Sequence, residues 1–557
     1  MDSKENKSPF VFARLSPHNI EAHQAFSNVV DTILNQPTQF EDHCKFLSYS
    51  PTQVPLHSVL SVSSTSSSAG TGTDTETEPT VGEDVRAKMM DQMIWKGCFT
   101  LSLDVLPSRP AFGWRAGSGR WKNDATGAVD LILTYSTLSD DVRGSHFWLS
   151  FNKNTGVLML QPRHSGRNGI KLKAMYYAGQ SNAQALIETA SVIQAGRLEY
   201  KFEYTFQGHS AADKTFQLSK IKYFRDHLKA PPPIAATSIT PSWNSMAIGP
   251  WTIPGTVGKG SYGVVSAAIH QNGTVVAVKS FLRFDRPTER STMNEMVTAQ
   301  TLMNHIQGQD NREYILQLKE VIFQRGASKF DRGPPEQVWM LYTPLAHCTF
   351  SPYCLSQRDD TISREARVAL LEQVLKGVIC LHAQNWVHRD LKPANLGVVS
   401  VEPPKAVILD LGLAHHIEAS DIKVGIQPTP GQVGTVMYLA PEMELQPYNE
   451  KVDIWAFGLI ALQLMTGFHP WKMAVNPWRP DTNVDYNHTL LYYHTHLRDW
   501  KRSAPDTVEN LVSKLLEWDP KDRLSASEAL QHPFFDTGHA KAPVSQEIET
   551  GKKRQRD

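Results

Sequence analysis

The sequence has little cysteine, with five residues in a chain of 557 and no C-x-x-C pair. They are Cys44, Cys98, Cys348, Cys354 and Cys380. Small secreted domains are dense in disulfides, and structural zinc sites need closely spaced thiols. The scattered positions therefore exclude a disulfide framework and a cysteine-built zinc site, and we expect a reduced, intracellular protein.

The sequence also lacks an excess charge of either sign and any long hydrophobic run. Lys+Arg and Asp+Glu both number 56, which gives no general attraction to nucleic acid or to an anionic membrane. No apolar run approaches a membrane span, and the N-terminus lacks a secretory hydrophobic region. We therefore expect no direct nucleic-acid partner and no membrane partner. The basic run 551–556 allows a nuclear location, and a cytoplasmic protein with a solvated end is the alternative.

A chain of 557 residues is too long for one hydrophobic core, so we expect several domains. Two low-complexity segments mark the boundaries between them. The first, from about Ser58 to Glu83, is rich in Ser, Thr and Gly, and the second contains Ala230-Pro231-Pro232-Pro233. The predicted parts are an N-terminal segment without a signature (1–50), a disordered Ser/Thr-rich linker (51–88), a β domain (89–207), a second linker (208–248), a large domain (249–536) and a basic disordered tail (537–557).

Short β-type runs recur through residues 90–207. In Tyr200–Phe206 aromatic and polar residues alternate, so that the aromatic side chains share one face of a strand. The pattern predicts an all-β sandwich or barrel. The predicted strands are Cys98–Val105, Val129–Thr134, His146–Phe151, Val157–Gln161 and Tyr200–Phe206.

The stretch Val387–Asn395 reads V-H-R-D-L-K-P-A-N. Phosphoryl transfer to a hydroxyl needs a carboxylate to accept the proton, and Asp390 supplies one. Lys392 places a cation near the moving charge, and Asn395 offers an amide oxygen to a metal ion. The stretch resembles the H-R-D-L-x-x-x-N catalytic loop of protein kinases.

A glycine-rich stretch, G-K-G-S-Y-G-V-V, lies upstream at Gly258–Val265. Dinucleotide-binding folds share G-x-G-x-x-G but continue into a helix. Here a strand-like run follows and ends in V-A-V-K at Lys279, like the V-A-I-K strand of kinases. The resemblance implies that these residues bind ATP: Gly258, Lys259, Gly260, Ser261, Tyr262, Gly263, Val265, Ala277 and Lys279. It also implies that Glu295 holds Lys279 in place, and Asp285 and Glu289 are the alternatives.

Further motifs follow in the order found in serine/threonine protein kinases. Leu409–Gly412 corresponds to D-F-G with Leu in place of Phe, and Gly434–Glu442 matches G-T-x-x-Y-x-A-P-E. The resemblance implies a bilobal α+β protein kinase fold, with a β-rich N-lobe and a helical C-lobe. Such an enzyme transfers the γ-phosphate of ATP to Ser or Thr of protein substrates with Mg²⁺. Asn395 and Asp410 are the implied metal ligands, and Thr435 is implied to bond Asp390 and Lys392.

The resemblance extends to the end of the domain. Asp453–Gly458 resembles the start of the D-x-W-x-x-G helix, and His532–Phe535 resembles the closing H-P-F-F. Arg523 is implied to pair with Glu442.

Regulation is also implied by the resemblance. Arg389, which precedes Asp390, would bind a phosphate on the activation segment, which runs from Asp410 to Glu442. We predict Thr429 as the phosphorylated residue and Ser420 as the second choice. A segment that is ordered without phosphate is the alternative.

The β region carries a second resemblance, on Gly119-Arg120, Ser145-His146 and Ser165…Asn168-Gly169. It resembles a forkhead-associated (FHA) domain, which binds phosphothreonine on loops at one end of a β-sandwich. Arg forks and short polar donors suit a phosphate dianion. The implied phosphothreonine-binding residues are Arg120, Arg143, Ser145 and Asn168. The order Arg143-Gly144-Ser145-His146 departs from the family's Ser-Arg-x-His, and a sandwich that only packs or scaffolds is the alternative.

Two other functions compete with an active kinase of checkpoint-kinase-like architecture. A pseudokinase scaffold would bind partners without catalysis, and Gly397, where kinases carry a large apolar residue under adenine, keeps this alternative open. A phosphothreonine-binding adaptor would use mainly the β domain. Kinases that prefer Arg upstream of the target carry Glu where this chain has Ala394, so we also predict no strong preference for basic substrates.

Overall fold

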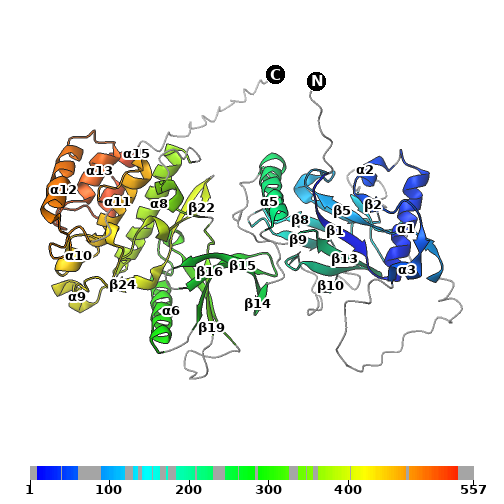
Figure 1. The fold of residues 1–557 in the computed structure, drawn as a ribbon, viewed down its shortest axis with the longest axis horizontal. Helices are drawn as coiled ribbons and strands as arrows, with labels where there is room; N and C mark the ends of the chain where they lie inside the picture. The colour runs from blue at the N-terminus through cyan, green and yellow to red at the C-terminus, as the bar shows by residue number, and fades with distance from the viewer. Residues whose placement is uncertain are drawn as a thin grey trace, which may run out of the picture. The chain divides into compact units, whose positions relative to one another are not determined.

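The computed structural model describes most of the chain, in the following residues: 9–38, 40–60, 90–118, 129–135, 141–153, 155–163, 171–173, 183–206, 210–229, 245–260, 263–282, 286–324, 337–346, 348–355, 362–401, 403–471 and 476–536. The chain forms two compact units, Met1–Lys279 and Ser280–Asp557. Figure 1 colours both from the N-terminus (blue) to the C-terminus (red).

The first unit begins with two β-sheets. The six-stranded sheet has the order β10-β12-β13-β1-β5-β2, with bounds Lys171–Lys173, Ala190–Ala195, Leu198–Tyr204, Val11–Pro17, Gly97–Ser102 and Leu47–Tyr49. The five-stranded sheet has the order β11-β9-β8-β6-β7, with bounds Gln184–Ala185, Leu158–Pro162, Phe147–Phe151, Trp114–Gly117 and Leu131–Ile132. A two-stranded ladder joins β3 (Val54–Pro55) to β4 (Met93–Ile94).

Both sheets contribute to one hydrophobic core. Tyr200 and Phe202 of β13 are buried there with Trp114 of β6 and Phe147 of β8. On the other face of β13, Lys201 Nζ lies 3.1 Å from Glu203 Oε1. The alternation predicted for this strand is thus confirmed, although Phe206 lies beyond its end.

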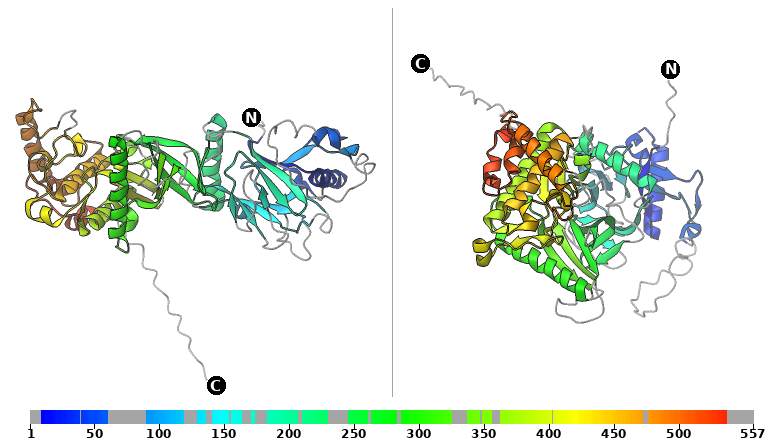
Figure 2. Two further views of the ribbon diagram at one scale, coloured as in Figure 1. Left: turned by 90° about the horizontal axis from the view of Figure 1, so that it is seen from below. Right: turned by 60° about the vertical axis from the view of Figure 1, so that its left-hand side comes forward.

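Helices complete this core, which is not built of strands alone. Helix α1 (Ile20–Asn35) begins at Asn19, whose Oδ1 accepts the Ala22 N–H, and buries Phe26 and Val30. It lies against β1 and β13. The short helices α2 (Glu41–Cys44) and α3 (Leu56–Leu60) follow it (Figure 1). Figure 2 shows this N-terminal part of the chain in blue from two further directions.

The structure differs from the predicted divisions in three places. Strands β1 and β2 belong to the same sheet as the β region, since β1 pairs antiparallel with β13 and β5 and β2 pairs with β5, so these strands are not part of a separate N-terminal segment. Strand β3 and helix α3 lie in the segment 51–88 that was predicted to be a disordered linker. Helix α5 (Ala211–Tyr223) and the π-helical turn Phe224–Leu228 lie in the predicted linker 208–248 and pack aromatic side chains into the core.

Another six-stranded sheet has the order β14-β15-β16-β17-β19-β18. Its strands are Met246–Ile248, Trp251–Gly260, Gly263–His270, Val275–Leu282, Gln337–Thr343 and Gln317–Phe323. Helix α6 (Arg286–Ile306) follows β17 in the chain.

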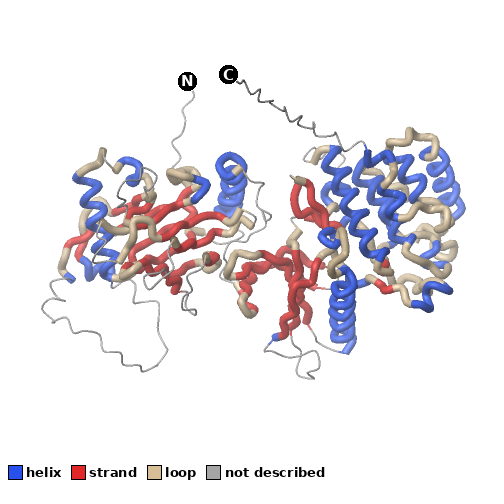
Figure 3. The backbone as a smooth tube through the Cα atoms, turned by 180° about the vertical axis from the view of Figure 1, so that it is seen from behind, coloured by secondary structure: helices blue, strands red, loops and turns tan. Residues whose placement is uncertain are grey.

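Beyond β19, the second unit is mainly helical, as the blue segments of Figure 3 show. Its helices are α7 (Ser351–Leu355), α8 (Arg364–Ala383), α9 (Ala419–Val424), α10 (Glu442–Leu445), α11 (Lys451–Thr466), α12 (Tyr486–Trp500), α13 (Val508–Leu515), α14 (Ala526–Leu530) and α15 (Pro533–Asp536). Short strands lie between them: β20 (Cys348–Thr349), β21 (Trp386–Val387), β22 (Leu396–Val401), β23 (Pro404–Ile408) and β24 (His415–His416).

Helices α8 and α11 form the centre of the helical core. Ser363 Oγ caps α8 by accepting the Ala366 N–H, and the helix buries Leu371, Val374 and Val378. Helix α11 is buried around nearly its whole circumference, as expected for a helix at the centre of a bundle. Among the described helices, none combines the length and the apolar character needed to cross a membrane.

Near the C-terminal end of the second unit, buried His532 makes two hydrogen bonds that require a neutral imidazole. His532 is 4% exposed; its Nε2 donates to Asn510 Oδ1 at 3.1 Å, and its Nδ1 accepts the Phe534 N–H at 3.3 Å. Burial lowers the pKa of His532 from 6.5 to about 4. The unfolded chain therefore binds a proton that the folded chain excludes between these pH values.

We expect the free energy of unfolding to fall as the pH drops from about 6.5 towards 4. The contribution of His532 is complete above pH 6.5 and declines by at most roughly 1.4 kcal/mol per pH unit. Chemical denaturation at pH 7 and pH 5 measures this slope. His532→Gln should have a shallower slope, although His23, whose pKa burial also lowers to about 4, contributes in both proteins. An identical slope in wild type and variant contradicts the prediction.

Candidate active site

The predicted catalytic loop brings four of its expected residues into one hydrogen-bonded network. Lys392 Nζ donates to Asp390 Oδ2 at 2.7 Å and to Thr435 Oγ1 at 2.8 Å. Thr435 Oγ1 in turn donates to Asp390 Oδ1 at 2.6 Å. Asn395 Nδ2 donates to the main-chain oxygen of Asp390 at 2.8 Å and to Oδ2 at 3.0 Å. Both carboxylate oxygens are therefore held in fixed positions.

The buried carboxylate of Asp453, on α11, accepts hydrogen bonds from the main chain of this loop. Asp453 accepts the N–H groups of His388 (2.8 Å) and Arg389 (2.9 Å), and His382 Nε2 lies 3.0 Å from its Oδ2. Burial alone would raise the pKa of Asp453, but the hydrogen bond and charge of His382 and the charge of His388 outweigh it and lower the pKa. The motif that contains Asp453 was identified from the sequence, but this contact was not predicted. The indication in the sequence is an Asp within an otherwise apolar helix, since a buried carboxylate needs hydrogen-bond donors.

The two predicted metal ligands lie on adjacent segments. The Leu409 N–H donates to the Asn395 main-chain oxygen at 2.8 Å, which places Asp410 beside the catalytic loop. The hydrogen bonds of Asn395 use its amide nitrogen, so its amide oxygen is the atom suited to a metal ion. Among the described residues, no three His, Cys, Asp or Glu side chains gather to hold a metal on their own. An ion here would need further oxygen ligands, and the phosphates of a nucleotide would supply them.

Glu295 of α6 lies next to Asp410. An ideal Cβ on Gly412 would lie 3.3 Å from both Asp410 Oδ1 and Glu295 Cδ, so both carboxyl groups border this glycine. Burial first, and then the charges of Glu295 and Asp410, raise the pKa of nearby Tyr342. The concentration of acidic groups makes this a place suited to cations.

The nucleotide-binding residues predicted from the glycine-rich stretch lie on one hairpin and the strand after it. The main chain of Gly260 pairs with Gly263, where β15 meets β16. Val265 lies on β16, and Ala277 and Lys279 lie on β17. Ser261 and Tyr262 lie outside the described residues.

The glycine that left the pseudokinase alternative open is closely packed. A Cβ on Gly397 would lie 2.7 Å from Ala346 Cβ, 3.0 Å from Val407 Cγ1 and 3.2 Å from Leu409 Cδ1. The space that a larger side chain would occupy is thus filled by its neighbours. Gly397 is a packing requirement here and leaves no void, which removes the argument for a loosened nucleotide site.

The activation segment has its own anchors. The N–H groups of Ile426 and Tyr448 each donate to the other's main-chain oxygen, and the Gly431 N–H donates to Glu444 Oε1 at 2.9 Å. Arg389 donates through Nε to the Leu413 oxygen at 2.8 Å. Thr429 is exposed.

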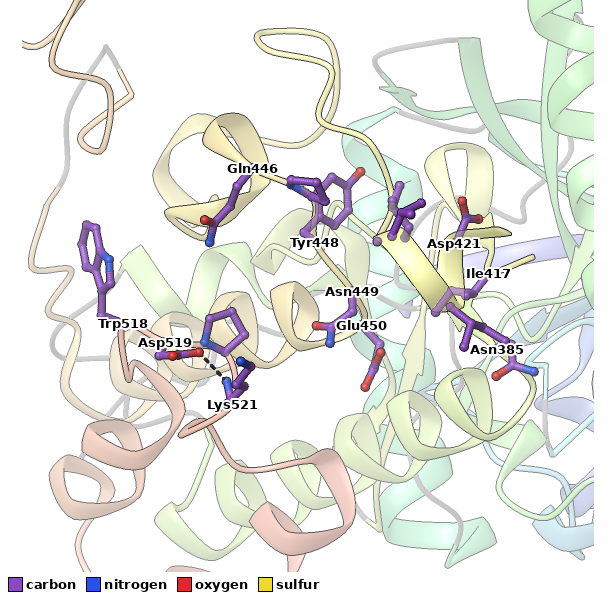
Figure 4. Close-up of a pocket in the computed structure, with 16 residues that line it drawn as sticks. Asn385, Ile417, Asp421, Gln446, Tyr448, Asn449, Glu450, Trp518, Asp519 and Lys521 are labelled. Carbon is purple, nitrogen blue, oxygen red and sulfur yellow. Dashed lines mark hydrogen bonds between the residues drawn. The ribbon is translucent and has the colours of Figure 1, made fainter. Parts of the chain in front are cut away.

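A groove of larger volume lies elsewhere in the second unit. It measures about 760 Å³ and lies between Asn385 and the segments 417–426, 446–450 and 518–521. Figure 4 shows Tyr448 on one side and Trp518, Asp519 and Lys521 on another. None of Asp390, Asn395 and Asp410 lines it, so size alone does not identify the reactive centre.

In the first unit, three loop segments meet at one end of the sheets. The Ser118 N–H after β6 donates to the Arg143 oxygen at 2.9 Å, and the Arg163 N–H after β9 donates to the His146 oxygen at 3.2 Å. Ser145 Oγ accepts the Trp148 Nε1–H at 3.0 Å. Arg143 and Ser145 therefore lie on one loop, which contacts the loops after β6 and after β9, whereas Arg120 and Asn168 lie outside the described residues.

Comparisons with known proteins agree with this geometry in the second part of the chain. The protein kinase domain family matches residues 251–535. The liver/testis isoform of the phosphorylase b kinase gamma catalytic chain from Mus musculus is 34% identical over 191 residues, which are 33% of this chain and 43% of that protein. The serine/threonine-protein kinase pakH of Dictyostelium discoideum is 28% identical over 298 residues, 53% of this chain and 51% of that protein.

The chain thus spans about half the length of the curated relatives it matches. The crystal structure of Rad53 1-466 in complex with AMP-PNP aligns at a TM-score of 0.42 and 20% identity, over 76% of this chain and 91% of that one. The family match covers more than half of the 557 residues and includes the network around Asp390. The chain belongs to the protein kinase family.

Proposed function

We propose that the protein is an active serine/threonine kinase that transfers the γ-phosphate of ATP to protein hydroxyls. The observation that carries the proposal is the network in which Lys392 and Thr435 fix both carboxylate oxygens of Asp390. A substrate hydroxyl bound against this carboxylate can give up its proton as its oxygen attacks phosphorus. Lys392 balances the negative charge that develops there.

The other proposed roles follow from the kinase resemblance and fit the residues present. Asn395 and Asp410 would hold Mg²⁺, which offsets phosphate charge during transfer. Lys279 and the main chain of Gly258–Gly263 would bind the phosphates of ATP. Glu295 is proposed to orient Lys279. Thr435, which bonds both Asp390 and Lys392, supports a preference for Ser and Thr over Tyr.

A radiolabel transfer assay tests the proposal. The full chain is incubated with γ-labelled ATP, Mg²⁺ and a peptide library in which the acceptor is Ser, Thr or Tyr. We expect label on Ser and Thr peptides and none with Asp390→Asn, although the variant melts at the wild-type temperature. A folded wild-type chain that is stabilised by Mg-ATP but transfers no label would instead identify a pseudokinase scaffold.

Phosphorylation of Thr429 is proposed to activate the kinase by pairing with Arg389. Thr429 is exposed, and Gly431 has a φ of 71°, which allows the sharp bend that this pairing needs. We expect Thr429→Ala to lower peptide phosphorylation by about tenfold or more, within the usual range for a switch. Ser420→Ala is the matched control, with little expected effect. Full activity after phosphatase treatment would show that the anchors of the segment suffice without phosphate.

A second candidate function concerns the N-terminal sheets, which we propose form an FHA-like module that binds phosphothreonine peptides. The meeting of the loops after β6, before β8 and after β9 at one end supports it. The exposed guanidinium of Arg143 has no partner within the described part of the chain, and is suited to a phosphate. Paired phosphothreonine and threonine peptides test the proposal on the full chain. Arg143→Ala should abolish selective binding, and Arg14→Ala, an exposed position on β1, should not.

A further inference from the structure

A small cavity borders the catalytic network at Lys392 and Thr435, and neither Asn395 nor Asp410 lines it. Its volume is about 210 Å³, and its walls include Lys392, Ala394, Thr435, Met437, Gln463 and His469. Pockets for whole small molecules usually measure about 300–1,000 Å³. This cavity is therefore of a size for a single side chain.

The position of the cavity identifies whose side chain could enter it. Lys392 and Thr435 line it and both bond the carboxylate of Asp390, at 2.7 Å and 2.6 Å. The substrate hydroxyl must approach that same carboxylate. Because successive Cα atoms are about 3.8 Å apart, an occupant of the cavity is a residue close in sequence to the phosphorylated one.

The charge of the walls restricts the occupant. Every residue that lines the cavity is described, and none is Asp or Glu. Lys392 contributes an ammonium group. A substrate Lys or Arg would thus lose water beside a like charge and find no carboxylate in the walls, which disfavours its charged form.

Apolar side chains form part of the remaining walls. Met437, Ala394 and the buried Cys354 present carbon and sulfur. Tyr438 donates its hydroxyl to Gln463 Oε1 at 2.8 Å, and its ring packs edge-on against His469 with centroids 5.4 Å apart. These contacts hold the walls in place, so an apolar side chain would bury surface without breaking a hydrogen bond.

We propose that this cavity binds an uncharged, apolar side chain of the protein substrate, near the phosphorylated residue, and rejects a basic one there. The inference rests on the proposed kinase activity and adds a class of substrate to it. It goes beyond the absence of Glu at position 394, because Gln463 and Met437 come from other segments of the chain.

Peptides that carry one Ser acceptor and vary at each flanking position provide the test, with relative kcat/KM as the readout. For the wild-type full chain we expect one flanking position at which Leu, Met or Phe exceeds Arg by at least about tenfold. At that position Gln463→Glu should shift the ratio towards Arg by about tenfold or more. The new carboxylate can still accept the Tyr438 hydroxyl, and it provides the missing counter-ion. Gln531→Glu, an exposed position with the same change of charge, should leave the ratio as it is.

The outcomes separate this inference from the proposed function. No transfer to any Ser or Thr peptide would overturn the kinase proposal itself. Equal rates for Leu and Arg peptides at every position, or faster transfer to Arg peptides by the wild type, would disprove the proposed specificity of the cavity and leave the kinase proposal intact. If Gln463→Glu melts at a lower temperature, Ala394→Glu repeats the charge change from another wall, and an unshifted ratio in both variants counts against the pocket.

Discussion

Replacement of Asp410 with asparagine is expected to slow phosphoryl transfer by about a thousandfold, which corresponds to about 4 kcal/mol of transition-state stabilisation. The variant loses one anionic oxygen at the position proposed to hold Mg²⁺. Steady-state kinetics with a preferred peptide at saturating ATP measure the effect. Asn is the suitable replacement because Asp410 has a φ of 53°, a left-handed conformation that Asn tolerates better than most residues.

The melting temperature should stay within about 1 °C of wild type, because the fold loses only one charge at a half-exposed site. Asp506→Asn makes the same chemical change at an exposed position in the second unit and serves as the control. Excess Mn²⁺, which accepts amide oxygens, should restore part of the rate. Near-normal transfer by Asp410→Asn with unchanged melting would disprove the role assigned to Asp410.

Replacement of Arg523 with leucine is expected to destabilise the helical part of the second unit by about 3–5 kcal/mol. Arg523 NH1 donates to Glu442 Oε1 at 2.6 Å and NH2 donates to Oε2 at 3.1 Å. Its guanidinium also donates to the main-chain oxygens of Lys451 and Glu517 and lies 5.0 Å from the Trp455 ring. Leucine would leave the Glu442 carboxylate, which is 2% exposed, without a counter-ion.

Thermal unfolding should show a fall in Tm of roughly 10 °C for Arg523→Leu. Arg498→Leu is the control, because the Arg498–Asp499 pair is 3.6 Å long, with both side chains about half exposed or more, and such pairs contribute little. A Tm for Arg523→Leu within about 2 °C of wild type would show that the buried pair is replaceable.

Local patterns predicted most of the active site because kinase chemistry places its residues in short, closely spaced stretches. Asp390, Lys392 and Asn395 lie within six positions, and one loop brings them together. Helix α8 was predictable for a related reason, since its cap at Ser363 and its apolar spacing are both local. Thr435 was predicted from resemblance, and its contact with Asp390 spans 45 positions.

The features that were not predicted depend on contacts between segments that are distant in the chain, and a local sequence pattern does not indicate such contacts. Strand β1 joins the first sheet through Leu15 and Phe202, which lie far apart in the chain. Helix α5 has few apolar residues for its length, so the prolines that follow it suggested a linker, yet Phe216 and Tyr223 are buried. The position of Gln463 in the wall of the cavity beside Lys392 was missed because nothing near it in sequence indicates catalysis.

The contact between Asp453 and the catalytic loop has a consequence for hydrogen exchange. The N–H groups of His388 and Arg389 end on a carboxylate that is 1% exposed and belongs to the most buried helix of the unit. Their protons can exchange with solvent only when that helix separates from the loop, so their protection should equal that of the α11 core amides. The proposed catalytic loop would then open only together with the helical core.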